Sequence, residues 1–441
     1  MGDTLKYISE DELSVHNKKD DLWISISGKI YNVTNWVNNH PGGDLPLLYF
    51  AGQDVTNVFL AYHPKSCHLY LDKFFTGYHI KDYNPSEMSQ DYRNLWSDFE
   101  KLGLFDNKGH GILITMIIAV MLFYASIYGV LTSDSFWVHL SCGGLLGLSW
   151  IQFVWITHDS AHYQVMVTPG WNRFANLFIA NCVAGLSISW WKKGHNAHHI
   201  ATNSLEYDPI TQSLPVFAQT SKSFSSLTSH FYEKKMDFDS FTRQLISYQH
   251  FTFFLSIVFA RVLQFVESFN LLLSRKNNVF YRVQELLGLL VFWTWFTLLV
   301  LSLPDVVSMI AFVAVTFIVA GIQSFQIIMN HVCCDTYIEP PVGNDWLEKQ
   351  TRGSLNIACS PWMDWFHGGL QFQIEHHLFP RMPRCQLRNI SPMVKKLCEK
   401  HNLPYNCANS FWEASAMTLD VVCVVASEAR NYVHPVPKKL I

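Results

Sequence analysis

The sequence predicts a polar N-terminal head, followed by an all-α polytopic membrane domain with four transmembrane helices and a cytosolic histidine-rich cap. Three observations predict this fold class. Residues 1 to about 110 are polar, whereas the rest of the 441-residue chain contains long apolar runs. The composition is 49% hydrophobic and 15% aromatic, which is enough apolar surface for more than one domain. Histidines cluster beside the ends of the apolar runs.

The head begins without a targeting segment. The start MGDTLKYISE has no basic region followed by an apolar one, so we expect no cleavable signal peptide. The 32 basic and 35 acidic side chains give a net charge of −3 without a basic arm, which argues against a nucleic-acid partner. The ten cysteines show no CxxC spacing, so we expect no disulfide framework and a reducing, cytosolic environment.

Four apolar runs are long enough to cross a bilayer as helices, since each approaches the ~20 residues that a hydrocarbon core requires. They are roughly Ile112 to Leu131, Phe136 to Thr157, Leu286 to Leu303 and Val306 to Met329. The connectors TSDS and PD are so short that they force two tight hairpins, which puts both connectors on one side of the membrane. The connectors lack Lys and Arg, while basic residues flank the opposite ends. The positive-inside rule therefore places the head and both termini in the cytosol.

A further apolar stretch, Phe251 to Leu273, carries Arg261 and Glu267. Charged side chains are costly inside a bilayer, so we predict an interfacial helix here and not a fifth span. A fifth crossing would also place the two ends of the chain on opposite sides of the membrane.

Eight histidines gather near one predicted membrane surface. The segments HDSAH and HNAHH have spacings of three or four residues, which place side chains on one face of a helix, and QIEHH repeats the pattern with glutamine in the first place. A single histidine follows the fourth span in MNHV. The predicted metal ligands are His158, His162, His195, His198, His199, His331, His376 and His377, and Gln373 is predicted to share the metal-facing side with the last pair.

This many imidazoles indicates two metal ions, because neutral imidazole ligates iron, zinc or copper and eight ligands exceed what one ion accepts. A single HxxxH is more often a surface pair, and a structural zinc site usually includes cysteine, which these clusters lack. Asp159 and Glu375 are predicted to orient imidazoles. Gln373 could ligate through its carbonyl oxygen or hold a bound water.

The head contains a second histidine pair. His40 precedes a Pro-Gly-Gly turn in WVNNHPGGD, and His63 lies in a comparable loop, FLAYHPKS. Two such loop histidines can clamp a planar cofactor from opposite faces, as in an electron-transfer haem with two axial histidines. We therefore predict His40 and His63 as axial haem ligands.

The segment from Tyr7 to Lys81 resembles a cytochrome b5 domain. The order HPGGD, HDSAH, HNAHH, QIEHH resembles the cytochrome b5 fusion front-end desaturases, particularly the plant sphingolipid Δ8 and acyl Δ6 desaturases. This resemblance implies an α+β cytochrome b5-like haem domain over residues 1–85, a linker over 86–110 and a membrane fatty acid desaturase domain over 111–441. It also implies haem b on His40 and His63, and two non-haem iron ions on the eight clustered histidines.

Desaturation of an unactivated methylene requires a strong oxidant made from O₂ at iron. The resemblance implies a membrane lipid substrate and electrons supplied through the fused haem by an NADH-cytochrome b5 reductase. We prefer Δ8 desaturation of a sphingolipid long-chain base, with acyl-lipid Δ6 desaturation as the alternative. A di-iron lipid hydroxylase and a membrane-anchored haem electron carrier are two further hypotheses. The end KKLI, with Lys438 and Lys439, resembles a retrieval signal for the endoplasmic reticulum.

Overall fold

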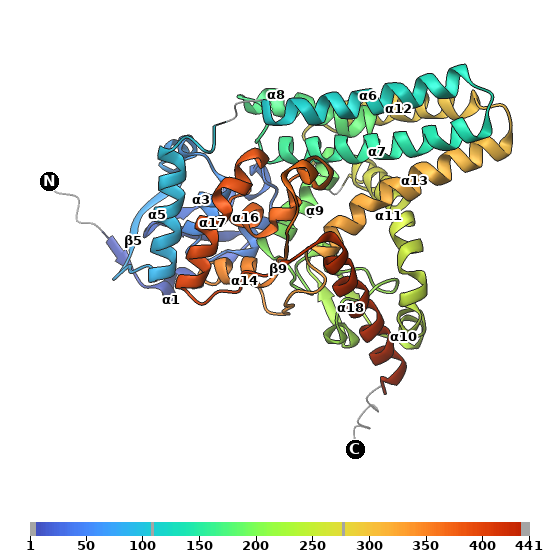
Figure 1. Cartoon of the computed structure of the whole chain (residues 1–441). Helices are drawn as coiled ribbons and strands as arrows, with labels where there is room; N and C mark the ends of the chain where they lie inside the picture. The colour runs from blue at the N-terminus through green and yellow to red at the C-terminus, as the bar shows by residue number, and fades with distance from the viewer. Residues whose placement is uncertain (1–5, 107–109, 276–277, 434–441) are drawn as a thin grey trace.

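The computed structural model describes residues 6–106, 110–275 and 278–433. An N-terminal head lies against a cap formed by residues 188–248 and 330–433, and a long helical bundle extends from the cap (Figure 1). The lysines of the predicted retrieval signal, Lys438 and Lys439, lie outside the described residues.

The head is an α+β unit on a five-stranded sheet of order β1-β5-β4-β3-β2. β1 pairs with β5 in parallel, and the other neighbours are antiparallel. Ser27 and Gly28 close the β3–β4 hairpin with φ of 52° and 77°, as a two-residue type I′ turn requires. The strands are β1 Lys6–Ile8, β2 Asn17–Lys18, β3 Asp21–Ile26, β4 Lys29–Asn32 and β5 Phe75–Ile80. The helices are α1 Glu10–Ser14, α2 Leu45–Tyr49, α3 Thr56–Tyr62, α4 His68–Leu71 and α5 Glu87–Lys101, with 3₁₀ segments η1 Thr34–Asn39 and η2 Lys65–Cys67.

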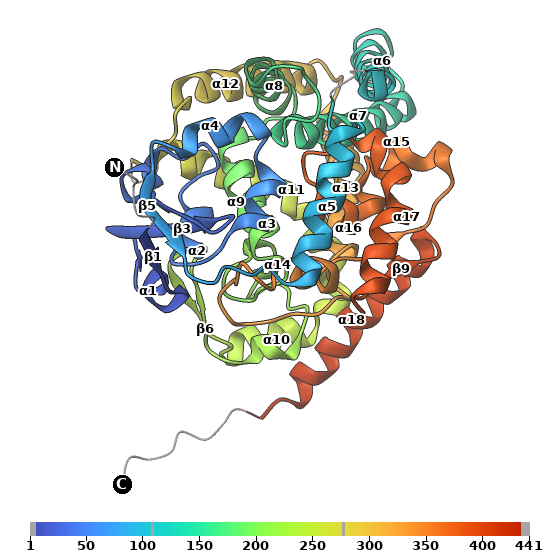
Figure 2. The ribbon, with the colours of Figure 1, turned by 90° about the vertical axis from the view of Figure 1, so that its left-hand side faces the viewer.

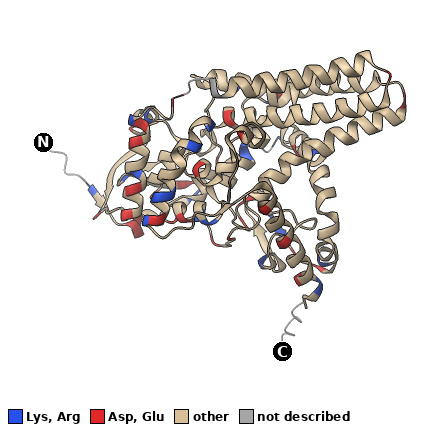
Figure 3. Ribbon diagram, in the orientation of Figure 1, with Lys and Arg blue, Asp and Glu red and all other residues tan. Residues whose placement is uncertain are grey.

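The bundle contains four long helices that correspond to the four predicted spans. They are α6 His110–Thr132, α7 Phe136–Ala161, α12 Arg282–Leu301 and α13 Val306–Met329. Both hairpin connectors lie at the end of the bundle away from the head and cap (Figure 1). Gly143 and Gly147 let α7 approach α13 closely, because a Cβ at either position would lie 2.7 Å from a carbonyl oxygen of α13. Figure 3 shows few charged residues along the bundle, in contrast to the head and cap.

α11, Gln249–Leu273, is a fifth helix that is long and apolar enough to cross a membrane, one more than the four predicted. Figure 1 shows α11 at a steep angle to the other four. Arg261 does not face water: it is 4% exposed, donates to the carbonyl oxygen of Ala184, and its guanidinium carbon lies 5.1 Å from the centre of the Trp150 ring. One of the two charges from which we predicted an interfacial helix therefore points into the protein.

A sharply bent pair of helices leads from the bundle into the cap. α8 Pro169–Asn176 continues into the π-helix η3 Leu177–Val183, and α9 Ile188–Ile200 turns away by 112°. Gly185 lies at the bend with φ of 71°, and a Cβ there would lie 2.4 Å from the Phe292 ring. Only glycine fits this position, on grounds of both backbone conformation and space.

Glu285 of α12 fixes the start of α9. Its fully buried carboxylate accepts hydrogen bonds from the hydroxyls of Ser187, at 2.6 Å, and of Ser189. Ser187 also caps α9 by accepting from the backbone N–H of Trp190. A carboxylate near a helix N-terminus is further stabilised by the helix dipole, so a bundle residue determines where α9 begins.

The cap combines α9 with several short elements. Its other helices are α10 Ser240–Ser247, α14 Trp346–Arg352, α15 Asp364–His367, α16 Gln373–Leu378, α17 Arg384–Lys400 and α18 Phe411–Asn431. Its 3₁₀ helices are η4 Pro209–Thr211, η5 Ser221–Phe224, η6 Pro361–Met363 and η7 Leu370–Phe372. Two small sheets pair β6 Leu227–Ser229 with β7 Lys234–Met236, and β8 Asn356–Ile357 with β9 Cys407–Ala408.

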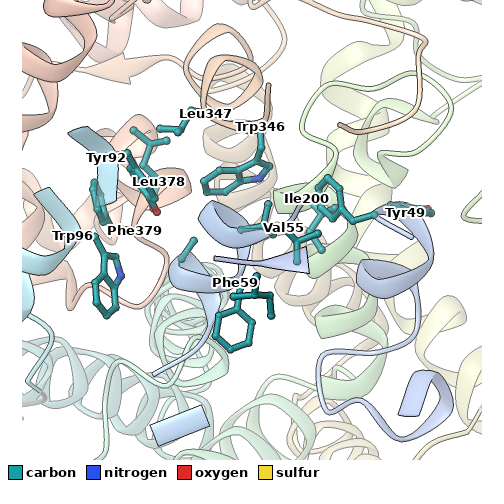
Figure 4. Packing of buried hydrophobic residues seen from close by; sticks show 14 of the residues in the cluster. Tyr49, Val55, Phe59, Tyr92, Trp96, Ile200, Trp346, Leu347, Leu378 and Phe379 are labelled. Atoms are coloured by element: carbon teal, nitrogen blue, oxygen red, sulfur yellow. The ribbon is translucent and has the colours of Figure 1, made fainter. Parts of the chain in front are cut away.

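Head and cap share one hydrophobic core, so the head is packed in a defined position. Figure 2 looks onto the head and shows α3 in front of α9, and α5 beside α16 and α17. Figure 4 shows side chains of both parts in contact: Tyr49, Val55, Phe59, Tyr92 and Trp96 from the head, and Ile200, Trp346, Leu347, Leu378 and Phe379 from the cap. Full burial of a large apolar side chain contributes about 1.5–3 kcal/mol, so such a core holds the two parts together.

Candidate metal centre and haem site

The two predicted haem ligands lie side by side in the head. His40 follows η1 and His63 follows α3, and their ring centroids are 5.9 Å apart. The Nδ1 atoms of both rings hydrogen-bond to carbonyl oxygens, His40 to Gly43 at 2.8 Å and His63 to Phe59 at 3.1 Å. When Nδ1–H donates in this way, Nε2 keeps its lone pair for a metal.

Burial keeps both imidazoles neutral. It lowers the pKa of His40 below its ordinary value and the pKa of His63 to about 3. A neutral ring with Nδ1 already bonded to the backbone is the form that ligates haem iron. The pair therefore fits a haem clamped between the two loops.

All eight histidines predicted as metal ligands meet in two adjacent sets. Within each set the potential ligand atoms lie within 4.8 Å of one another. The first set is His158, His162, His195, His199 and His376, and the second set is His198, His331 and His377. In the first set the Nε2 atoms of neighbouring rings lie 2.9 to 3.1 Å apart, and in the second set those of His198 and His331 lie 3.3 Å apart.

Four segments bring these rings together. The end of α7 supplies His158 and His162, and a turn directly after α13 supplies His331. α9 and α16 each contribute to both sets, because neighbouring positions on a helix point to different sides. On α9, His195 and His199 join the first set and His198 joins the second, and on α16 His376 and His377 divide in the same way.

The electrostatics of both sets favour metal binding. Burial, followed by the neighbouring imidazoles, lowers the pKa of six of these rings well below its ordinary value, so they are neutral at pH 7. These are His162, His195, His199, His331, His376 and His377. Neutral nitrogen lone pairs facing one another at about hydrogen-bond distance suit cations, and imidazole is a ligand of iron, zinc and copper. The donor sets therefore fit two metal ions.

Partners outside the two sets orient the rings, as is usual for metal-binding histidines. The Nδ1 of His158 lies 3.1 Å from Asp159, as predicted, and Asp159 also binds Arg384. The prediction for Glu375 is wrong: this carboxylate accepts from Asn356 and Tyr405, and within the described residues it has no hydrogen bond to a histidine of either set.

Three orienting partners escaped the sequence prediction. Asp208 accepts from the Nδ1 of His198 at 2.8 Å, Gln350 accepts from the Nδ1 of His377 at 2.8 Å, and the Gly353 carbonyl accepts from the Nδ1 of His331 at 2.7 Å. Asp208 follows the end of HNAHH by nine residues in the segment EYDP, which was a local signal. Gln350 and Gly353 are distant in sequence, and no spacing rule connects them with the histidines.

Gln373 lies beside the three histidines of the second set. Its Nε2 is 2.9 Å from the Nε2 of His331 and 3.0 Å from the Nε2 of His377, and its buried Oε1 has no partner among the described residues. The amide thus occupies a place where a fourth imidazole would complete this set. It faces His377, four residues further along α16, and not His376.

Comparisons with known proteins agree with this geometry. Residues 134–409 match the fatty acid desaturase family, and residues 9–80 match the family described as a cytochrome b5-like heme/steroid binding domain. The whole chain is 52% identical to the Delta(8)-fatty-acid desaturase of Helianthus annuus over 440 residues, 100% of this chain and 96% of that protein. The chain belongs to the cytochrome b5-fused front-end desaturases.

Further relatives of this desaturase bear two other names. The acyl-lipid (9-3)-desaturase of Borago officinalis is 54% identical over 436 residues, which are 99% of this chain and 97% of that protein. A Delta 8-(E)-sphingolipid desaturase of Kluyveromyces lactis is 32% identical over 330 residues, which are 73% of this chain and 57% of that protein.

Three other residues near the histidine sets take structural places in this desaturase. The Asn330 side chain donates to the carbonyl oxygens of Leu355 and Leu370, so it holds two loops together. Trp191 stacks on His195 with ring centroids 4.2 Å apart. The buried His367 lies in neither histidine set, and its ring contacts Phe366 and Phe411.

Proposed function

We propose that this front-end desaturase introduces a Δ8 double bond into a sphingolipid long-chain base at a di-iron centre. The single observation that carries the di-iron part is the convergence of eight imidazoles into two adjacent sets. The Δ8 position is supported by the Helianthus annuus relative, and the sphingolipid substrate by the Kluyveromyces lactis relative. The 54% identity to the acyl-lipid (9-3)-desaturase supports acyl-lipid Δ6 desaturation as a second candidate.

In this proposal each residue set has one role. His158, His162, His195, His199 and His376 hold one iron; His198, His331 and His377 hold the other, with Gln373 beside them. His40 and His63 hold haem b. Iron at the two sets supplies the strong oxidant, made from O₂, that removal of hydrogen from an unactivated methylene requires.

The chain's own residues provide the environment for this chemistry. Asp159, Asp208 and Gln350 fix ring orientations, and the burial of the histidine sets excludes water from the oxidant. Overall, removal of two hydrogens from the lipid would consume one O₂, two protons and two electrons and would form two waters, and a haem held by His40 and His63 would supply the electrons. A separate NADH-cytochrome b5 reductase renews the haem electrons in this scheme.

For the membrane we propose four crossing helices, α6, α7, α12 and α13, with α11 at the interface. The head, the cap and both termini then face the cytosolic side of the endoplasmic reticulum membrane. What supports this arrangement is that both hairpin connectors lie at the bundle end opposite to the cap. The proposed domains are residues 1–85, 86–110 and 111–441. The orientation can be tested by placing a cysteine in each connector and adding a membrane-impermeant thiol reagent to the outside of sealed microsomes. Labelling of these cysteines would contradict the proposed orientation.

Expression in a yeast that lacks these products tests the reaction. We expect new Δ8 long-chain bases and unchanged fatty acids. New Δ6 fatty acids with unchanged long-chain bases would replace the substrate assignment, and alcohols in place of alkenes would indicate a hydroxylase. The variant His376→Ala should abolish the product while the haem spectrum stays intact. Product formation by this variant would refute the assignment of the first histidine set.

A further inference from the structure

One aromatic side chain lies between the haem ligands and the histidine sets. Tyr62 is the last residue of α3 and directly precedes the haem ligand His63. Its ring meets the imidazole of His199 edge to face, with centroids 6.2 Å apart and planes at 90°. Tyr62 is thus bonded through the backbone to His63 of the haem site, and its ring contacts His199 of the first histidine set.

The ring that Tyr62 touches is central among the eight. His199 belongs to the first set, where its centroid lies 4.4 Å from that of His195 and 4.7 Å from that of His376. It also stacks on His377 of the second set, at 4.2 Å and 18°. The His199 ring is therefore in contact with rings of both sets.

The haem loops are held against α9 at a constant separation. Asn196, the residue after the ligand His195, donates to the carbonyl oxygen of Gly42 at 3.0 Å. That glycine adjoins Gly43, whose carbonyl binds the Nδ1 of the haem ligand His40 at 2.8 Å. On another side of the head, Gln53 accepts from the backbone N–H of Gly343 at 2.9 Å. With the shared core, these bonds keep Tyr62 in place during turnover.

The ring of Tyr62, and not its hydroxyl, makes the contact with His199. The hydroxyl of Tyr62 is buried and has no hydrogen-bond partner among the described residues. The variant Tyr62→Phe therefore keeps the ring and breaks no hydrogen bond among these residues, so it separates the ring from the hydroxyl.

We propose that the Tyr62 ring is the route by which electrons pass from the haem to the di-iron centre. This inference rests on the proposed function, since it requires haem at His40 and His63 and iron at the two sets. Each transfer takes one electron from ferrous haem, which becomes ferric, to the iron held by His199 and its neighbours. O₂ is the final electron acceptor. Tyr62 acts here through its contact with His199 and is a positioning residue.

The rate at which haem is reoxidised tests the proposal. The full-length protein is purified with its haem and iron, reduced without oxygen, and mixed with oxygenated buffer containing the long-chain base substrate. Haem absorbance then reports reoxidation directly. We compare wild type with Tyr62→Leu, which removes the ring, and Tyr62→Phe, which keeps it. Tyr49→Leu is the matched control, because Tyr49 lies in the same interface and its ring contacts Tyr207, not a ligand histidine.

We expect Tyr62→Leu to slow haem reoxidation by an order of magnitude or more, with unchanged haem spectrum, haem potential and iron content. Tyr62→Phe should restore the rate, and Tyr49→Leu should match wild type. A wild-type rate in Tyr62→Leu would overturn the proposal, and so would an equally slow rate in Tyr62→Phe, which would assign the role to the hydroxyl. If Tyr62→Leu does not retain iron, Tyr62→Met, which conserves more volume, replaces it.

The variant His376→Ala separates this inference from the proposed function. If wild type and His376→Ala reoxidise haem equally slowly, the histidine sets do not receive the electrons and the proposed function fails. If wild type is faster than His376→Ala and Tyr62→Leu equals wild type, only the route through Tyr62 is wrong.

Discussion

Replacement of Asp208 by alanine tests how the second histidine set is held. The fully buried carboxylate accepts from the Nδ1 of His198 at 2.8 Å and from the backbone N–H groups of Asn203 and Ile210, each at 2.9 Å. Asp208→Ala leaves three donors without an acceptor. Each buried unsatisfied donor costs about 1–3 kcal/mol, so the variant loses several kcal/mol of the roughly 5–15 kcal/mol typical of a folded protein.

The same change releases the His198 ring from its fixed orientation. Loss of such an orienting partner typically lowers metal affinity or activity by about 10- to 100-fold. We expect purified Asp208→Ala to have less non-haem iron per haem, a lower thermal unfolding midpoint and little turnover, while the haem spectrum of the head is unchanged. Asp208→Asn, which keeps one acceptor oxygen, should lie between the variant and wild type.

Iron and haem are quantified in the same sample, so the haem of the head serves as the internal reference. Asp335→Ala is the control, because the Asp335 side chain is 71% exposed and pairs with Arg352 at the surface. A wild-type ratio of iron to haem in Asp208→Ala, together with normal turnover, would refute the reasoning.

Three further variants test other parts of the structure. Glu285→Ala leaves the hydroxyls of Ser187 and Ser189 without their acceptor at the start of α9, which should lower the unfolding midpoint and the iron content. Glu285→Gln should have a smaller effect. Equal iron content in wild type and both variants would contradict this role. Gln373→His places a fourth imidazole in the second set and should change turnover; unaltered turnover would show that the amide is incidental. Burial lowers the pKa of His367 from 6.5 to about 4, so between these pH values the unfolded chain binds a proton that the folded chain does not. The stability that this residue contributes is therefore complete above pH 6.5 and is lost as the pH falls toward 4. His367→Phe should reduce the difference between the unfolding midpoints at pH 7 and pH 5. The same difference in the variant as in wild type would count against this assignment.

The sequence predicted the clustering of the histidines, because the spacings within each segment are local. Residues three or four apart on a helix share a face, so HDSAH and HNAHH could be assigned as ligand clusters before any fold was known. All eight predicted metal ligands lie in the two sets, and the paired His40 and His63 lie 5.9 Å apart. The five-stranded α+β head also agrees with the prediction.

The failures concern residues whose partners are distant in sequence. Arg261 was one of the two charges from which the interfacial helix was predicted, and only the structure shows that it reaches the carbonyl oxygen of Ala184 at the bend. Glu375 lies within QIEHH and yet accepts from Tyr405. Gln350 lies outside all the histidine segments and yet binds the ring of His377. Hydropathy and spacing describe one segment at a time, so they cannot show which buried polar groups meet.

The sequence alone determined which residues are candidates for the chemistry, because ligand type, helical spacing and apolar length are local properties of the chain. Only the tertiary structure decided how the eight histidines divide into sets of five and three, since that depends on how α7, α9, α13 and α16 cross. Only the packing of head on cap placed Tyr62 against His199, because a contact between residues 137 positions apart depends on the shared core and not on either segment.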